Sequence, residues 1–143
     1  YQPARTNIRY IPIELSRSGM NPLAELKYLW TLYLIYRKER PDYIFHYTIK
    51  PNIYGSIAAR MCGIPSTAMI AGLGYVFNTR GIGSKVARAL YRFAMRFPQH
   101  ILVLNTYNRD LVLKEHIATS KQLILLSGGE GINLTQYNFQ CKT

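Results

Sequence analysis

Acidic residues are scarce in this chain of 143 residues, which has seven Asp and Glu against eighteen Lys and Arg and a formal net charge of +11. No acidic residue lies between Asp42 and Asp110, a stretch that carries eight cations. A surface of one sign favours an anionic partner, which means nucleic acid, nucleotide phosphates or an acidic membrane. The charge does not choose among these three classes.

Cysteine and long apolar runs are also scarce. The two cysteines, Cys62 and Cys141, are widely spaced and the three histidines lie far apart, so neither a disulfide framework nor a metal site is expected. The longest apolar run, 28–36, has about half of the ~20 residues that cross a bilayer. We therefore expect no transmembrane helix, and a reducing cytoplasm is the default compartment.

The usual motifs of catalysis and nucleotide binding are missing as well. The chain has no Walker motif, no nucleophile elbow and no close pair of carboxylates. Gly72-Leu73-Gly74 is a partial glycine-rich loop without the third glycine, or the acidic residue ~20 positions on, that a dinucleotide site requires. We therefore predict no cofactor and assign no catalytic residue, and a plain tight turn explains the two glycines as well as a ligand does.

The hydrophobic residues, 48% of the chain, are enough for one packed domain. Short β-branched and aromatic runs alternate with longer helical patterns, which predicts an α/β fold with a mainly parallel sheet. We expect strands at 42–47, 66–71, 100–104 and 122–126, and an edge or irregular strand at 9–15, which contains a proline. We expect helices at 22–40, 52–62, 84–97 and 108–118. The predicted domain spans 1–127, and 128–143 begins a linker or tail.

Polar residues and glycines follow the predicted strands, where parallel α/β sheets bind their ligands. Lys50, beside a helix N-terminus, could hold a phosphate or carboxylate, or it could be a solvated turn cation with Asn52 as a helix cap. His46 could act as an acid, a base or a donor, or it could be a structural residue at the end of an apolar strand. The candidate site residues are His46, Thr48, Lys50, Asn52, Gly72, Leu73, Gly74 and Asn105.

The predicted helix 84–97 is amphipathic, with cations repeating along one face and apolar residues along another. Such a helix is a candidate for lying on an anionic membrane, where each cation near the surface contributes about 1 kcal/mol. The alternative is an ordinary helix that covers the core and has a solvated basic exterior. The candidate membrane-binding or anion-binding residues are Arg80, Lys85, Arg88, Arg92 and Arg96.

Five stretches carry a resemblance to a known family. They are Tyr10–Ile13 with Leu15–Pro22, Arg40–Pro51, Tyr54–Arg60, Ala71–Phe77 and Gly129–Leu134. Together they resemble the N-terminal domain of GT-B fold, family-four-like bacterial glycosyltransferases of capsule and lipopolysaccharide synthesis. The resemblance implies a Rossmann-like three-layer sandwich, of which this chain is part.

The resemblance also implies a function. Such enzymes are retaining transferases that move a sugar from a nucleotide sugar to a lipid-linked saccharide on the cytoplasmic face of the membrane, and their N-terminal half receives the acceptor. The residues that follow the strands would then line the acceptor side of the cleft. The family's first strand, glycine loop and donor half have no counterpart here, so we expect a piece truncated at both ends that transfers no sugar alone.

Two further expectations follow. The alternative function is a basic, non-catalytic α/β module that binds nucleic acid or an anionic membrane, and the lack of RNA-binding sheet motifs and of a helix-turn-helix argues against nucleic acid. Without the family's first strands, strand 43–47 would be an open edge. Either 9–15 pairs with it, or two chains join there as a homodimer.

Overall fold

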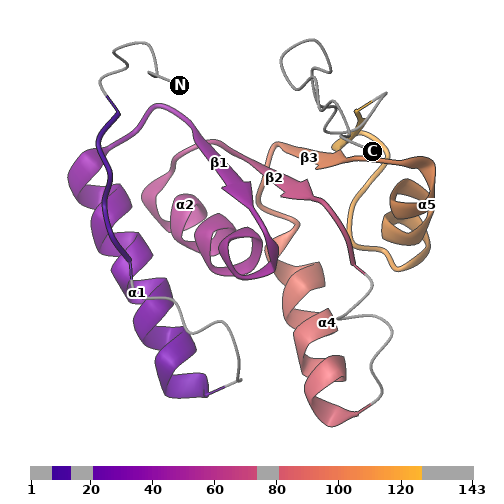
Figure 1. Ribbon diagram of the computed structural model, residues 1–143, viewed down its shortest axis with the longest axis horizontal. Helices are drawn as coiled ribbons and strands as arrows, with labels where there is room; N and C mark the ends of the chain where they lie inside the picture. The colour runs from indigo at the N-terminus through magenta and orange to yellow at the C-terminus, as the bar shows by residue number, and fades with distance from the viewer. Residues whose placement is uncertain (1–7, 14–20, 74–80, 127–143) are drawn as a thin grey trace, which may run out of the picture.

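The structure is a computed structural model that describes residues 8–13, 21–73 and 81–126 (Figure 1). Its centre is a four-stranded parallel sheet in the order β1-β2-β3-β4, which is also the chain order. The strands are β1 (Ile44–Tyr47), β2 (Ser66–Ile70), β3 (His100–Val103) and β4 (Leu123–Leu125). The α/β class and the parallel sheet predicted from the sequence are confirmed.

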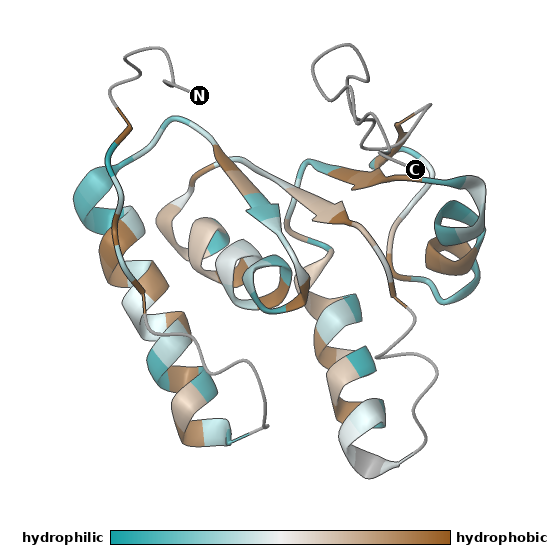
Figure 2. Cartoon of the chain, in the orientation of Figure 1, coloured by the Kyte–Doolittle hydropathy of each residue, from teal (hydrophilic) through white to brown (hydrophobic). Residues whose placement is uncertain are grey.

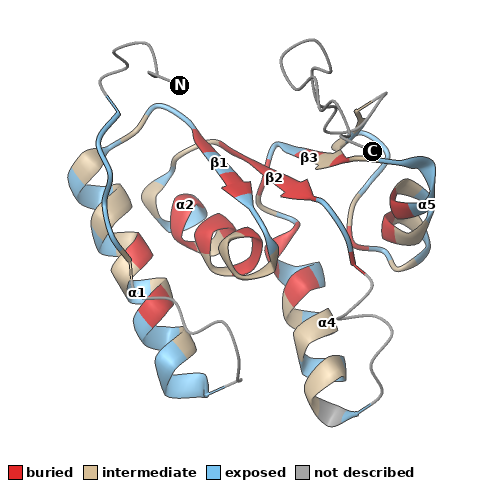
Figure 3. Ribbon diagram, viewed as in Figure 1, coloured by how far each residue is buried: buried red, intermediate tan, exposed pale blue. Residues whose placement is uncertain are grey.

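A helix follows each of the first three strands. The π-helical segment η1 (Pro51–Gly55) and α2 (Ser56–Cys62) follow β1, α4 (Ile82–Ala94) follows β2, and α5 (Thr106–Lys114) follows β3. Connections between parallel strands are right-handed, so strands added in chain order carry their connecting helices on the same face. The sheet is thus covered on one side by these helices, and Figure 3 shows buried residues on the strands as well as on α2, α4 and α5.

The main core lies between this helical layer and the sheet. The strand register brings His46, Ala68, Ile101 and Leu123 into one row across the sheet. The buried side chains packed there come from β2, β3, α4, α5 and the loops next to them. They include Ile70, Leu73, Tyr91, Ala94, Met95, Val103, Val112 and Ile117.

The helix that precedes the sheet, α1 (Pro22–Glu39), begins and ends on the signals that its sequence predicts. The Asn21 side chain accepts the Leu23 N–H at 3.1 Å, proline opens the first turn, and Arg40 ends the helix in the left-handed region at φ 45°. Tyr28 and Leu32 pack against Ala58 of α2, so α1 lies beside α2. Figure 2 shows apolar and polar residues alternating along α1.

The other face of the sheet is exposed on its two edge strands but buried on β2, where Thr67 and Met69 are 6% and 5% exposed. In β1, Ile44 and His46 are buried whereas Phe45 and Tyr47 are exposed, and Ile124 of β4 is exposed on the same side as they are. The described helices therefore form one layer, and the second helical layer of a three-layer sandwich is not among the described residues.

The segment expected as a strand at 9–15 has no strand in its described part, 9–13. It runs along α1 instead (Figure 1), where Arg9 pairs with Glu39 and Ile13 packs on the Tyr28 cluster. The alternative in which this segment pairs with β1 is therefore wrong for residues 9–13, because they form no strand and Arg9 and Ile13 find their partners on α1. Joining of two chains at the β1 edge stays a prediction.

Three expected helix starts need correction. The helix expected at 108 begins at Thr106, because Asn105 rather than Asn108 caps it. The helix expected to be capped by Asn52 already includes Pro51, and Asn52 lies inside it. The helix expected at 84–97 spans Ile82–Ala94. No helix among the described residues is long and apolar enough to cross a membrane.

Candidate functional site

The candidate site lies at the carboxyl edge of the sheet, where β1, β2 and β3 end. Thr48, the first residue after β1, is exposed and has φ 74°. For a β-branched residue this left-handed conformation is strained, and such strain gathers at ligand sites. The Thr48 carbonyl accepts the N–H of Asn52 at 3.0 Å, so the strained turn leads directly into η1.

Lys50 lies in an ion pair. Its Nζ is 2.6 Å from Oε1 of Glu25, which comes from the first turn of α1, and the two side chains are 21% and 13% exposed. The other carboxylate oxygen of Glu25 has no hydrogen-bond partner among the described residues. Burial, followed by the Glu25 charge, raises the pKa of neighbouring Tyr54 to about 12. Lys50 is therefore a largely buried, paired cation and not a solvated one.

His46 lies beneath this edge, on the face of β1 that the helices cover, and is 2% exposed. Its Nε2 is 3.3 Å from the Tyr36 hydroxyl and its Nδ1 is 3.4 Å from the Ser56 hydroxyl. A Cβ on Gly55 would come within 2.5 Å of the imidazole ring. Burial lowers the pKa of His46 to about 4, so the ring is neutral near pH 7. This placement fits the structural alternative for His46 better than a role as acid or base.

The loop after β2 contributes Gly72 and Leu73. Leu73 is buried in the main core, whereas Gly72 is exposed. A Cβ on Gly72 would meet no atom within 4 Å, and its φ is outside the left-handed region. Neither the backbone nor the described neighbours therefore require glycine there, and the described residues leave the space beside Gly72 open. Gly74 lies outside the described residues.

Two asparagines at this edge differ from their expected roles. The Asn105 side chain caps α5 by accepting the Asn108 N–H at 2.7 Å. Asn52, which the sequence suggested as a cap, is buried and donates through Nδ2 to the Met69 carbonyl at 2.8 Å. Asn108, which follows the same strand as Asn105 in the sequence, also lies at this edge, and its Nδ2 donates to the Ala71 carbonyl at 3.2 Å. The residue that the sequence did not connect with the site is Glu25, which pairs with Lys50 across 25 residues.

The basic helix, α4, divides its apolar residues between the core and the surface. Tyr91 and Ala94 are buried, whereas Val86 is 58% and Phe93 is 50% exposed. Phe93 packs edge-to-face on Phe97 with ring centroids 5.1 Å apart. The surface of α4 therefore carries apolar side chains beside its cations.

The α4 cations are not equivalent. Lys85 and Arg96 are exposed, with no ion-pair partner in the described part of the chain. Arg92 is held by Glu115, with Nη2 2.7 Å from the carboxylate and Nε donating to the Glu115 carbonyl. Arg88 donates to the Ser84 carbonyl within the helix at 3.3 Å. Arg80 lies outside the described residues.

A cavity of about 440 Å³ lies at the opposite edge of the sheet, between the carboxyl ends of α1 and α2. Its lining includes Tyr33, Tyr36, Arg37, Arg40 and Cys62. Arg37 lies in the last turn of α1, where a cation complements the helix dipole. Among the described residues, no group of three His, Cys, Asp or Glu is placed to hold a metal.

The comparison with known proteins identifies the family. The family model described as Glycosyl transferase 4-like matches residues 2–105, and the chain belongs to this family. The match includes the strained turn after β1, the Lys50–Glu25 pair and the loop after β2.

Two curated relatives are similar to most of this chain. One is the N,N'-diacetylbacillosaminyl-diphospho-undecaprenol alpha-1,3-N-acetylgalactosaminyltransferase of Campylobacter jejuni, 26% identical over 135 residues that cover 91% of this chain and 35% of the relative. The other is the UDP-Gal:alpha-D-GlcNAc-diphosphoundecaprenol alpha-1,3-galactosyltransferase of Escherichia coli, 24% identical over 108 residues, 75% of this chain and 28% of the relative. The chain thus spans about a third of the length of these relatives.

Proposed function

We propose that this chain is the acceptor-side part of a glycosyltransferase that moves a sugar from a nucleotide sugar to a lipid-linked saccharide in surface polysaccharide synthesis. The proposal rests on the carboxyl edge of the sheet, which lies within the residues that match the family model. There the strained Thr48 and the open space beside Gly72 lie at the ends of neighbouring strands. The names of both relatives contain an undecaprenol diphosphate acceptor.

The acceptor diphosphate and its first sugar would lie along this edge. Thr48 offers an exposed hydroxyl, and Gly72 lets the acceptor approach the backbone. Lys50 adds a cation near the start of η1, with Glu25 fixing its position. The buried His46 lies beneath this edge and would not touch the acceptor.

The same protein would bind to the inner face of the cytoplasmic membrane, where a lipid-linked acceptor resides. The exposed Val86 and Phe93 beside Lys85 and Arg96 support this part of the proposal, because an apolar and basic helix face binds anionic lipid. Figure 1 shows the first turns of α4, which carry Lys85 and Val86, extending away from the sheet.

Acceptor binding tests the proposal directly. A short-chain, water-soluble polyprenyl diphosphate N-acetylhexosamine is titrated into the chain by calorimetry. Gly72→Val, which fills the open space, should weaken binding at least about tenfold, a loss of about 1.4 kcal/mol. The control Ser120→Val makes a similar change on an exposed turn at the opposite edge and should bind normally. A wild-type chain that does not bind the probe would refute the proposal.

A further inference from the structure

The central strand β2 continues past both of its neighbours at the carboxyl edge. Tyr47, the last residue of β1, pairs with Met69, and Val103, the last residue of β3, pairs with Ile70. The chain of β2 then continues through Ala71 and Gly72 to Leu73, which is buried in the core. The three residues 71–73 therefore leave the sheet without strand pairing on either side, although the candidate acceptor site depends on their position.

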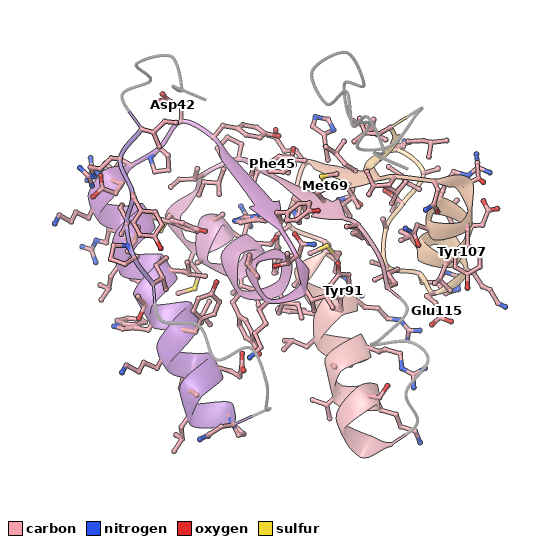
Figure 4. The ribbon with its side chains drawn as sticks, in the orientation of Figure 1. Asp42, Phe45, Met69, Tyr91, Tyr107 and Glu115 are labelled. Atoms are coloured by element: carbon pink, nitrogen blue, oxygen red, sulfur yellow. The ribbon has the colours of Figure 1, made fainter. Side chains whose placement is uncertain are left out.

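Asn52 approaches the exit of β2, which is the end of the strand with residues 71–73, from the side of β1. It is 1% exposed, and its Nδ2 donates to the Met69 carbonyl at 2.8 Å and to the Tyr91 hydroxyl of α4 at 3.3 Å. Figure 4 labels Met69 on β2 and Tyr91 on α4. One carboxamide thus joins η1, β2 and α4 at the point where β1 ends.

Asn108 reaches the same exit from the side of β3. It is 5% exposed, and its Nδ2 donates to the Ala71 carbonyl at 3.2 Å. Its own backbone N–H is already bonded to the Asn105 side chain. The Asn108 side chain is therefore not needed to cap α5, and its contact with Ala71 is a separate function of this residue.

We infer that Asn52 and Asn108 are positioning residues for the acceptor site, which hold the exit of β2 by its carbonyls at Met69 and Ala71. They continue the hydrogen bonding of the sheet beyond the ends of β1 and β3. With Ala71 held at one end and Leu73 anchored in the core at the other, Gly72 has a fixed backbone position. The link to the acceptor rests on the proposed function.

The energetics support a positioning role over simple packing. A carboxamide buried among apolar neighbours loses its hydration and is tolerated only where it makes hydrogen bonds. The Oδ1 of Asn52 has no partner among the described residues, so an apolar side chain of the same shape would be less costly for packing alone. The bonds to Met69 and Ala71 give a reason for asparagine at both positions.

The test replaces each asparagine by Leu, which keeps the shape and removes the donor, and by Asp as a second variant. Amide hydrogen exchange is measured at Gly72 and Leu73, with Ile101 of β3 as an internal reference. We expect Asn52→Leu and Asn108→Leu to speed exchange at Gly72 and Leu73 about tenfold and to weaken binding of the soluble polyprenyl diphosphate saccharide about tenfold. Exchange at Ile101 and binding to anionic vesicles should stay within about twofold.

Tyr43→Phe is the matched control, because the Tyr43 hydroxyl lies 2.7 Å from the Thr67 hydroxyl at the other end of β2. It should change neither local exchange nor saccharide binding. Unchanged exchange at Gly72 and Leu73 in both Leu variants, or an equal rise at Ile101, would overturn the inference. A wild-type chain that does not bind the saccharide would refute the proposed function, while the exchange comparison would still decide whether the asparagines fix this segment.

Discussion

The Lys50 ammonium lies 2.6 Å from the Glu25 carboxylate and joins the start of α1 to the segment that follows β1. Twenty-five residues separate the two in sequence. The pair fixes the turn that carries Thr48 against α1, so one edge of the candidate site is held by a largely buried ion pair.

Removing one partner should therefore destabilise the fold. We expect Lys50→Met to lower the free energy of unfolding by about 2 kcal/mol, because it leaves the Glu25 carboxylate poorly hydrated and unpaired. The double variant Lys50→Met with Glu25→Gln should regain most of this loss. Urea unfolding is measured for the wild type, for both single variants and for the double variant, and a double variant as unstable as the sum of its single changes would contradict the account.

The left-handed backbone conformation at Thr48 is more strained for a β-branched residue than for other residue types. Asparagine tolerates the left-handed region better than a β-branched residue, so Thr48→Asn should raise the free energy of unfolding by about 1 kcal/mol. The same change removes the hydroxyl and should weaken binding of the acceptor saccharide. If Thr48→Asn leaves stability unchanged or lowers it, the turn is not strained.

His46 makes stability depend on pH. Its pKa is lowered from 6.5 to about 4, so the unfolded chain binds the proton more readily. The free energy of unfolding is therefore highest above pH 6.5. It falls by about 3 kcal/mol in total as the pH falls toward 4. Comparison of unfolding curves for the wild type and His46→Gln should show the difference over this range. A His46 resonance that titrates near pH 6.5 by NMR would contradict the burial argument.

The surface of α4 predicts binding to anionic vesicles. Lys85→Glu with Arg96→Glu should abolish cosedimentation, and Val86→Ser with Phe93→Ser should weaken it about tenfold, because charge and apolar contact both contribute. Arg92 is left unchanged because it is paired with Glu115. Lys114→Glu with Lys121→Glu makes the same charge change on other exposed residues and should retain most of the binding. If both charge variants lose vesicle binding equally, the binding depends on net charge and not on the surface of α4.

Local signals in the sequence predicted the elements well. Asn21 and Pro22 are a helix cap and a first-turn proline and mark the start of α1, and Gly63 at φ 70°, a residue type typical of helix ends, ends α2. The segment 9–15 was harder, because its β-branched residues suit a strand while Arg9 and Ile13 find their partners on α1. Strand propensity alone does not determine whether such a segment pairs with a strand or packs on a helix.

The candidate site was predicted less completely, because its contacts are distant in sequence. A cap at Asn52 is a local interpretation, whereas its real bond to Met69 spans 17 residues and that of Asn108 to Ala71 spans 37. The pairing of Lys50 with Glu25 and the burial of His46 under α2 likewise depend on packing. The carboxyl ends of the strands were located to within one residue, which places the candidate residues along one edge of the sheet.

The most direct test of the central claim is calorimetric titration of the chain with the soluble polyprenyl diphosphate N-acetylhexosamine, in parallel with Gly72→Val and Ser120→Val. The account predicts saturable binding by the wild type and by Ser120→Val, and at least about tenfold weaker binding by Gly72→Val. Equal affinities in all three chains would contradict the placement of the acceptor at the carboxyl edge of β2, and no binding by the wild type would contradict the acceptor-side function.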